Sequence, residues 1–174
     1  MQPYGLDTVN VRAQVYGYAG AVARFRSAVA GRDAIAAYHP LFEALSWAAS
    51  LDFRIGELWA PDGQPFGEDW YMRPGGADVV PGLRWARNTV HHDWANALRL
   101  DTGGRRYPRH YPLRYFEWVW RDTAELPPNS RTKGKNDYAK LMAGQPAEVT
   151  LQLLGKIFDL VADCVEPPLP SADR

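Results

Sequence analysis

The stretch VRAQVYGYAGAVARFRSAV, residues 11–29, carries apolar side chains at spacings that alternate between four and three. Because an α-helix turns once in about 3.6 residues, these side chains fall on one helical face that other elements must cover. We expect Asp7 or Thr8 to cap this helix and Gly31 to end it. The stretch therefore predicts the first helix of a bundle. Its apolar positions are Val11, Val15, Tyr18, Val22, Phe25 and Val29.

The same periodicity predicts further helices along the chain. Residues 33–59 form the second, in which Pro40 marks either a kink or the first turn. Two more are expected near the end of the sequence, a short one over residues 137–143 and a longer one over 146–165. The Pro- and Gly-rich residues 60–80 predict a long loop, held to the body of the protein by its aromatic side chains. These are Phe66, Trp70 and Tyr71.

The expected fold is mainly α, a helical bundle of four to five helices with two long loops. Residues 115–121 are rich in aromatic side chains with partial alternation, which is typical of a strand or of one arm of a short β-hairpin. No partner strand is evident from the sequence. We expect one helical domain over residues 1–166, followed by an extended or disordered tail over residues 167–174.

The composition excludes several classes of protein. Twenty Lys and Arg residues balance twenty Asp and Glu residues, so any binding of nucleic acid has to depend on a local patch. The single cysteine excludes an internal disulfide. No apolar run is long enough for a signal peptide or a membrane span, so we expect a cytoplasmic protein without membrane contact. Because phosphate-binding glycine loops and nucleophile elbows are also missing, we expect no cofactor.

The most informative polar pattern is RWARNTVHHDW, residues 84–94, which we place within a helix over residues 81–100. On a helical projection its core face would be formed by Leu83, Ala86, Val90, Trp94, Ala97 and Leu98. Arg87 and His91 would lie at the edge of that face. Asn88 and His92 would lie on the opposite side, next to Trp85. An exposed Trp on a polar face predicts a contact with another segment or another subunit.

Each polar residue of this motif also has an ordinary structural interpretation. His91 would be a structural histidine bonded to a backbone carbonyl, and His92 a solvated surface residue. Arg87 would pair with an acid such as Asp52 or Glu57. A metal site is not expected, because adjacent histidines on a helix point about 100° apart and do not share an ion.

Arg87 and Asn88, followed after three residues by His92, resemble the signature of the HEPN superfamily (higher eukaryotes and prokaryotes nucleotide-binding). That signature pairs an Arg with a His a few residues later, often with a polar residue directly after the Arg. A similar spacing occurs twice more, in residues 32–39 and 105–110, but the first runs into a proline and the second contains one. Only residues 87–92 fall within a predicted helix that follows two long helices.

Members of this superfamily are all-helical bundles, commonly dimers, and many are metal-independent endoribonucleases in toxin–antitoxin, phage-defence or RNA-processing systems. The resemblance thus implies RNA as substrate, a homodimer formed through the motif helix, and an antitoxin-like protein partner. It implies that His92 is the acid or base, that Arg87 clamps the phosphate, and that Asn88 orients His92. On one helix Arg87 and His92 project about 140° apart. A dimer contact involving Trp85 would therefore be expected to complete the site.

The segment RRYPRHYPLRY, residues 105–115, interleaves basic and aromatic side chains downstream of the motif. Such a mixture supplies phosphate contacts and stacking surfaces in one loop. The candidate substrate-binding residues are Arg105, Arg106, Arg109 and His110. The alternative is an ordinary surface loop whose tyrosines pack on the bundle.

The leading functional prediction is a metal-independent endoribonuclease of HEPN-like type. The alternative is a noncatalytic helical interaction or nucleotide-binding module in which the motif is structural, because a fold does not fix a function. The position of His92 distinguishes the two. A cleft location beside Arg87 favours catalysis, whereas burial with both ring nitrogens bonded favours a structural role.

Overall fold

The computed structural model describes residues 4–58, 70, 79–101 and 117–164. Within these residues the protein is mainly α, with five α-helices, a short 3₁₀ helix and a small antiparallel sheet of two strands. The predicted fold class is confirmed. None of the described helices combines the length and the apolar character needed to cross a bilayer.

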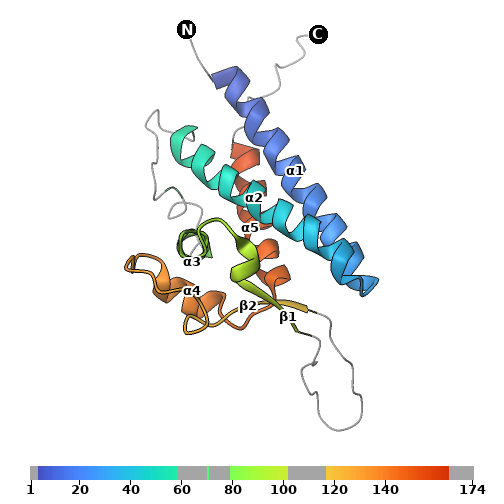
Figure 1. Ribbon diagram of the computed structural model, residues 1–174. Helices are drawn as coiled ribbons and strands as arrows, with labels where there is room; N and C mark the ends of the chain where they lie inside the picture. The colour runs from blue at the N-terminus through green and yellow to red at the C-terminus, as the bar shows by residue number, and fades with distance from the viewer. Residues whose placement is uncertain (1–3, 59–69, 71–78, 102–116, 165–174) are drawn as a thin grey trace, which may run out of the picture.

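Helices α1 (Tyr4–Ala30) and α2 (Ala34–Leu58) form an antiparallel pair joined by a tight turn (Figure 1). The predicted apolar stripe of α1 is buried from Val11 to Phe25. The helix ends just before Gly31, as predicted. It begins before the predicted caps, because regular helical backbone already includes both of them. In α2, Pro40 lies inside the helix, so of its two predicted positions the first turn is excluded.

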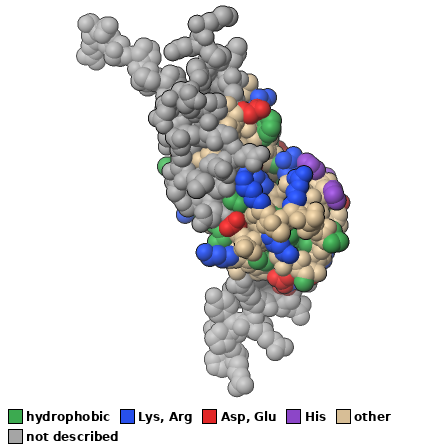
Figure 2. Space-filling model, turned by 90° about the vertical axis from the view of Figure 1, so that its left-hand side faces the viewer, with side chains coloured by type: hydrophobic (Ala, Val, Ile, Leu, Met, Phe, Trp, Pro, Cys, Tyr) green, Lys and Arg blue, Asp and Glu red, His purple; other side chains and the backbone are tan. Residues whose placement is uncertain are grey.

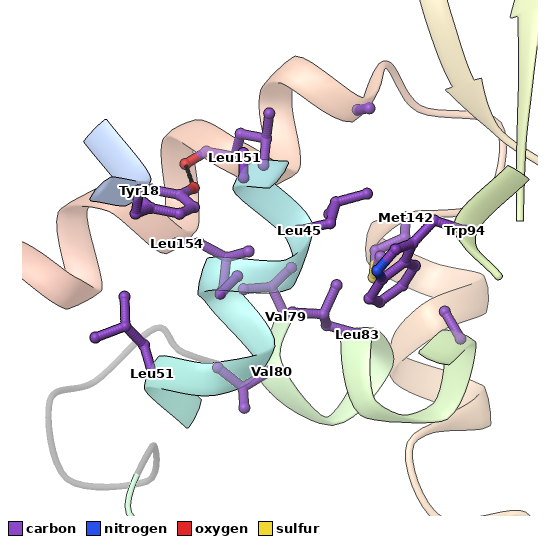
Figure 3. Packing of buried hydrophobic residues seen from close by; sticks show 14 of the residues in the cluster. Tyr18, Leu45, Leu51, Val79, Val80, Leu83, Trp94, Met142, Leu151 and Leu154 are labelled. Carbon is purple, nitrogen blue, oxygen red and sulfur yellow. Dashed lines mark hydrogen bonds between the residues drawn. The ribbon is translucent and has the colours of Figure 1, made fainter. Parts of the chain in front are cut away.

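Helix α5 (Ala147–Cys164) packs against this pair and confirms the predicted C-terminal helix. The Tyr18 hydroxyl of α1 donates a hydrogen bond of 2.5 Å to the carbonyl oxygen of Leu151. Burial raises the pKa of this hydroxyl well above its usual range, so it remains a donor. Figure 3 shows Leu45 of α2 between α5 and α3 (Val79–Thr89), the next helix along the chain. The central core is therefore formed by α2, α5 and that helix.

Helix α3 (Val79–Thr89) is much shorter than predicted, so a helix over residues 81–100 was wrong. A turn follows it, then the 3₁₀ helix η2 (Trp94–Asn96) and strand β1 (Leu98–Asp101). The apolar residues of this segment are still buried, but they lie in a turn, in η2 and in β1 and not on one helix. The ring of Trp94 meets that of Trp120 edge to face, with centroids 6.1 Å apart.

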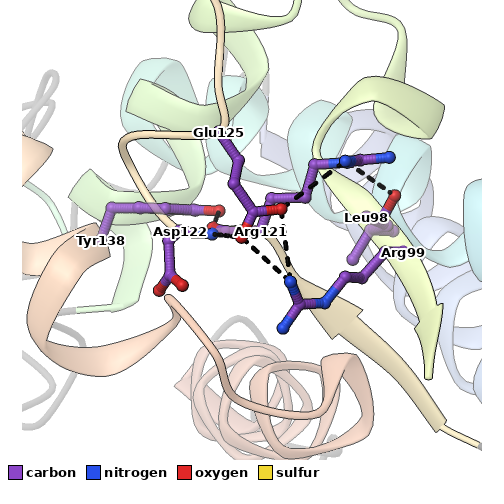
Figure 4. Close-up of polar contacts among 6 residues, drawn as sticks. All are labelled: Leu98, Arg99, Arg121, Asp122, Glu125 and Tyr138. Carbon is purple, nitrogen blue, oxygen red and sulfur yellow. Dashed lines mark hydrogen bonds and ion pairs between the residues drawn. The ribbon is translucent and has the colours of Figure 1, made fainter. Parts of the chain in front are cut away.

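Strand β2 (Glu117–Trp120) confirms the strand predicted within residues 115–121 and pairs with β1, with Leu98 opposite Trp120. Figure 4 shows the contacts that fix the end of this sheet. Arg121 donates to the carbonyl oxygen of Leu98 at 3.2 Å, and Arg99 pairs with Glu125 at 3.0 Å. The strand that follows the motif is thereby tied to the body of the protein.

Helix α4 (Lys135–Leu141) confirms the short helix predicted at about this position and packs on α3. The rings of Trp85 and Tyr138 lie 5.0 Å apart across this contact. The Tyr138 hydroxyl also donates to the carbonyl oxygen of Arg121. Gly134 precedes α4 in the left-handed conformation with φ 84° and touches the first turn of α3. Helix α4 thus holds the segment before it against α3.

Gly134→Ala is expected to destabilise the protein by about 2 kcal/mol. A Cβ there would lie 2.7 Å from the carbonyl carbon of Pro81, in a backbone conformation that L side chains rarely adopt. Gly144→Ala is the matched control, since φ is 70° there but the nearest atom to a Cβ is 3.9 Å away. It should cost about 1 kcal/mol. Urea denaturation followed by circular dichroism measures both, and equal losses would contradict the close contact at Pro81.

Candidate functional site

The motif residues sit where α3 ends and the chain reverses. The His92 amide donates to the carbonyl oxygen of Arg87 at 3.0 Å, and the Asp93 amide to that of Val90 at 2.9 Å. His91 and His92 both have positive φ, 50° and 70°. Helices commonly end with a left-handed residue, but this residue is usually Gly, and a bulkier one adds strain. Two consecutive left-handed histidines are therefore a notable feature of the site, since such strain concentrates at functional positions.

The reversal brings His92 back to the helix it has just left. Arg87 Nε donates a hydrogen bond to His92 Nδ1 at 3.1 Å. The two residues thus meet within one chain, and the expected 140° separation does not arise because the helix stops between them. An Nδ1 that accepts a hydrogen bond carries no proton, so the proton of neutral His92 lies on Nε2. His92 is exposed, and Nε2 has no partner among the described residues.

Two further predictions for the motif were wrong. His91 is exposed, not bonded at the edge of the core. Trp85 was placed on an open polar face but is only 3% exposed, and its Nε1 donates to the carbonyl oxygen of Arg131 at 2.9 Å. The segment before α4 covers this side of α3, which no helical projection of α3 alone reveals. Asn88 is exposed, as expected.

Asp52, one of the two acids predicted to pair with Arg87, pairs instead with Arg84, one turn earlier in α3. Arg84 forms a two-point pair with Asp52, Nε and Nη2 each lying 2.6 Å from a carboxylate oxygen. Trp70 Nε1 also donates to Asp52 at 2.8 Å. Trp70 is fully buried, which confirms that this aromatic residue anchors to the body of the protein. Phe66 and Tyr71 lie outside the described residues.

A pocket of about 710 Å³ opens beside the Arg87–His92 contact. Its walls come from the second half of α2, from α3 and from the segment before α4. Arg87 and Asn88 belong to the wall, so Arg87 joins the pocket to His92. The volume lies within the range of about 300–1,000 Å³ that is usual for small-molecule sites.

The segment before α4 is held in place by α3 side chains one turn apart. Asn129 Nδ2 donates to the Thr89 hydroxyl at 2.7 Å, and that hydroxyl donates to the Trp85 carbonyl oxygen at 2.8 Å. The Arg131 amide donates to Asn129 Oδ1 at 2.9 Å. Together with the bond from Trp85 to the Arg131 carbonyl oxygen, these contacts set Arg131 on the pocket wall.

The pocket carries positive charge that its own acids do not cancel. Asp52 forms an ion pair with Arg84, and the carboxylate of Glu57 lies 3.7 Å from the guanidinium of Arg54. The guanidinium groups of Arg87 and Arg131 have no carboxylate partner among the described residues. Figure 2 shows Lys and Arg side chains gathered on this side of the molecule, with histidines at the edge of the group. The pocket is therefore suited to an anionic ligand.

Phe53 and Arg131 are among the lining residues that the sequence did not indicate as site candidates. Phe53 was absent from the predicted sites because an exposed aromatic on a helix has no signature. The candidate substrate-binding residues Arg105, Arg106, Arg109 and His110 lie outside the described residues. Within the described part of the chain, no group of three His, Cys, Asp or Glu side chains is placed to hold a metal ion.

No protein-family model matches the chain, and no curated protein or solved structure shows significant similarity to it.

Proposed function

We propose that this protein is a metal-independent endoribonuclease of HEPN-like type, with Arg87, Asn88 and His92 in the active site. The observation that carries the proposal is the hydrogen bond from Arg87 Nε to His92 Nδ1, at an exposed position beside a positively charged pocket. A histidine and an arginine in contact supply a proton and a charge clamp at one point. His92 does not itself line the pocket, but it is exposed beside Arg87, which does, and it is not buried with both ring nitrogens bonded, so the catalytic interpretation of the motif is favoured.

The reaction needs no metal, because the nucleophile belongs to the substrate. The ribose 2′-oxygen attacks the adjacent phosphorus and gives up its proton to solvent. The bond from phosphorus to the 5′-oxygen breaks, leaving a 2′,3′-cyclic phosphate. His92 Nε2 donates the proton that the departing 5′-oxygen takes up, since Nδ1 accepts the hydrogen bond from Arg87. The imidazolate that this leaves is stabilised by the Arg87 guanidinium and regains its proton from solvent, which has received the proton of the 2′-hydroxyl. The acid role is thus the one that the geometry supports for His92.

Arg87 has two tasks in this proposal. Its Nε orients the imidazole, and its two Nη groups remain available to bind the nonbridging phosphate oxygens as negative charge grows on them. Asn88 adds an amide on the pocket wall. It serves to hold the substrate or to orient His92.

The proposal extends to the setting and the partners of the protein. A cytoplasmic toxin–antitoxin or defence role, with an antitoxin-like partner, follows from the resemblance to the HEPN superfamily. A homodimer through the motif helix is retained as part of the proposal, but Trp85 is buried within its own chain and so does not form that interface. The proposed chemistry does not require the dimer, because one chain joins Arg87 to His92.

Cleavage of RNA in excess EDTA tests the proposal. We expect the purified protein to cut a mixed RNA pool and to leave 2′,3′-cyclic phosphate and 5′-hydroxyl ends. The matched control is an RNA of the same sequence with 2′-O-methyl riboses, which lacks the nucleophile and should resist cleavage. Cleavage that is lost in EDTA would contradict the metal-independent mechanism, and binding of both RNAs without any cleavage would instead support the noncatalytic module.

A further inference from the structure

Phe53 is an unusual lining residue for a charged pocket. It lies on α2, is 62% exposed, and lines the pocket alongside Asn88 and Arg87. Among the described residues its ring stacks on no other aromatic ring. Keeping a large apolar ring in water gives up the free energy that its burial would contribute. A planar ligand group that covers the ring would recover that free energy.

The cations of the pocket complement this ring. Arg87 comes from the end of α3 and Arg131 from the segment before α4, so two different elements present uncompensated guanidinium groups to one space. Both guanidinium groups act as hydrogen-bond donors and never as acceptors, so they suit phosphate oxygens. Proteins that bind single-stranded nucleic acids use such an arrangement. The base stacks on an aromatic side chain, and the backbone phosphates bind the positively charged groups.

We infer that the pocket is a nucleotide subsite, in which one unstacked base packs on Phe53 and a backbone phosphate binds Arg87 and Arg131. The inference deepens the proposed function and rests on it, because Arg87 links this subsite to His92. The substrate would then be single-stranded RNA. A paired base is stacked within its helix and does not present a face to Phe53.

Binding should be measured with a His92→Asn protein, so that the RNA survives. The probe is a fluorescein-labelled single-stranded RNA of mixed sequence, about ten nucleotides long, followed by fluorescence anisotropy. Phe53→Leu keeps an apolar side chain but removes the ring face, and should raise Kd about tenfold. Phe53→Tyr keeps the ring and should restore binding. The RNA annealed to its complement should bind less tightly and respond little to Phe53→Leu.

Arg131→Ala should raise Kd by a similar factor of about ten and lower the salt dependence of binding by about one charge. The fold around it should persist, because Trp85 binds the backbone carbonyl of Arg131 and not its side chain. The matched controls are Tyr16→Leu and Arg24→Ala, which remove an exposed aromatic ring and an exposed cation from α1. Neither control should change Kd.

The inference is overturned if the single-stranded RNA does not bind, or if Phe53→Leu and Arg131→Ala bind like the parent or no more weakly than the controls. Its failure is separable from failure of the proposed function. Wild-type protein that cleaves RNA while these two variants bind normally would remove the subsite and keep the nuclease. Phe53-dependent binding by a wild-type protein that never cleaves would keep the subsite and remove the nuclease.

Discussion

Replacing His92 by asparagine is expected to lower RNA cleavage by about a thousandfold, whereas replacing His91 by asparagine leaves cleavage unchanged. Both histidines are exposed and both have positive φ. Asparagine tolerates this backbone conformation better than most residues, so each variant should keep the turn after α3. The pair therefore separates the side-chain chemistry of His92 from the shape of the chain. Of the two histidines, only His92 accepts a side-chain hydrogen bond from Arg87.

The rates should be measured as kcat/KM on a single-stranded RNA in EDTA, with circular dichroism to show that both variants are folded. A structural role for the motif would give a different pattern, in which neither change affects cleavage or both reduce it equally. Alanine is the poorer substitution at either position, because a Cβ without a compensating side-chain hydrogen bond adds strain at φ 70°. Loss of activity in His92→Ala would thus mix chemistry with backbone strain.

The helices of this protein were largely predictable because burial acts through local periodicity. The stripe from Val11 to Phe25 is apolar at helical spacing and is buried in the structure. Gly31 marked the end of that helix correctly, although the residue in the left-handed conformation is Arg32, with φ 56°. Alternation of aromatic residues likewise marked β2. In each case the signal lies within the element itself.

The end of α3 was not predictable in the same way. No Gly or Pro interrupts residues 83–98, and Val90, Trp94 and Leu98 keep a helical spacing of four. All three are buried, but they lie in a turn, in η2 and in β1 and not on one helix. The decisive partner is β2, whose pairing with β1 comes from a distant part of the chain. Tertiary contacts therefore overrode the local pattern.

For the candidate site, the sequence indicated residues that the structure brings into contact, Arg87 and His92, but not the geometry of that contact. The contact between Arg87 and His92 exists only because α3 stops early, so the motif was a better guide than the helix on which it was placed. The pocket was not predictable. Arg131 lies on its wall because Trp85 binds the Arg131 carbonyl oxygen and Thr89 binds Asn129, and these two hydrogen bonds join residues far apart in the sequence.

Arg87→Lys is expected to lower kcat/KM for RNA by about a hundredfold, although it keeps the charge. The arginine fork binds His92 through Nε and leaves two Nη groups for the phosphate. A lysine ammonium is a single point charge and cannot hold the imidazole while it also clamps two phosphate oxygens. The change should also alter the tautomer of His92, because Nδ1 loses the donor that keeps it unprotonated.

The two effects can be measured separately, which makes Arg87→Lys more informative than removal of the charge. Ring nitrogen chemical shifts of His92 report its tautomer, and cleavage assays report the rate. Arg24→Lys is the matched control, since it makes the same exchange at an exposed arginine of α1 that is paired with Glu43. If the tautomer changes while the rate stays at the wild-type value, the Arg87–His92 contact orients a histidine that takes no part in the reaction. If both change together, the proton on Nε2 and the clamp on the phosphate belong to one catalytic arrangement.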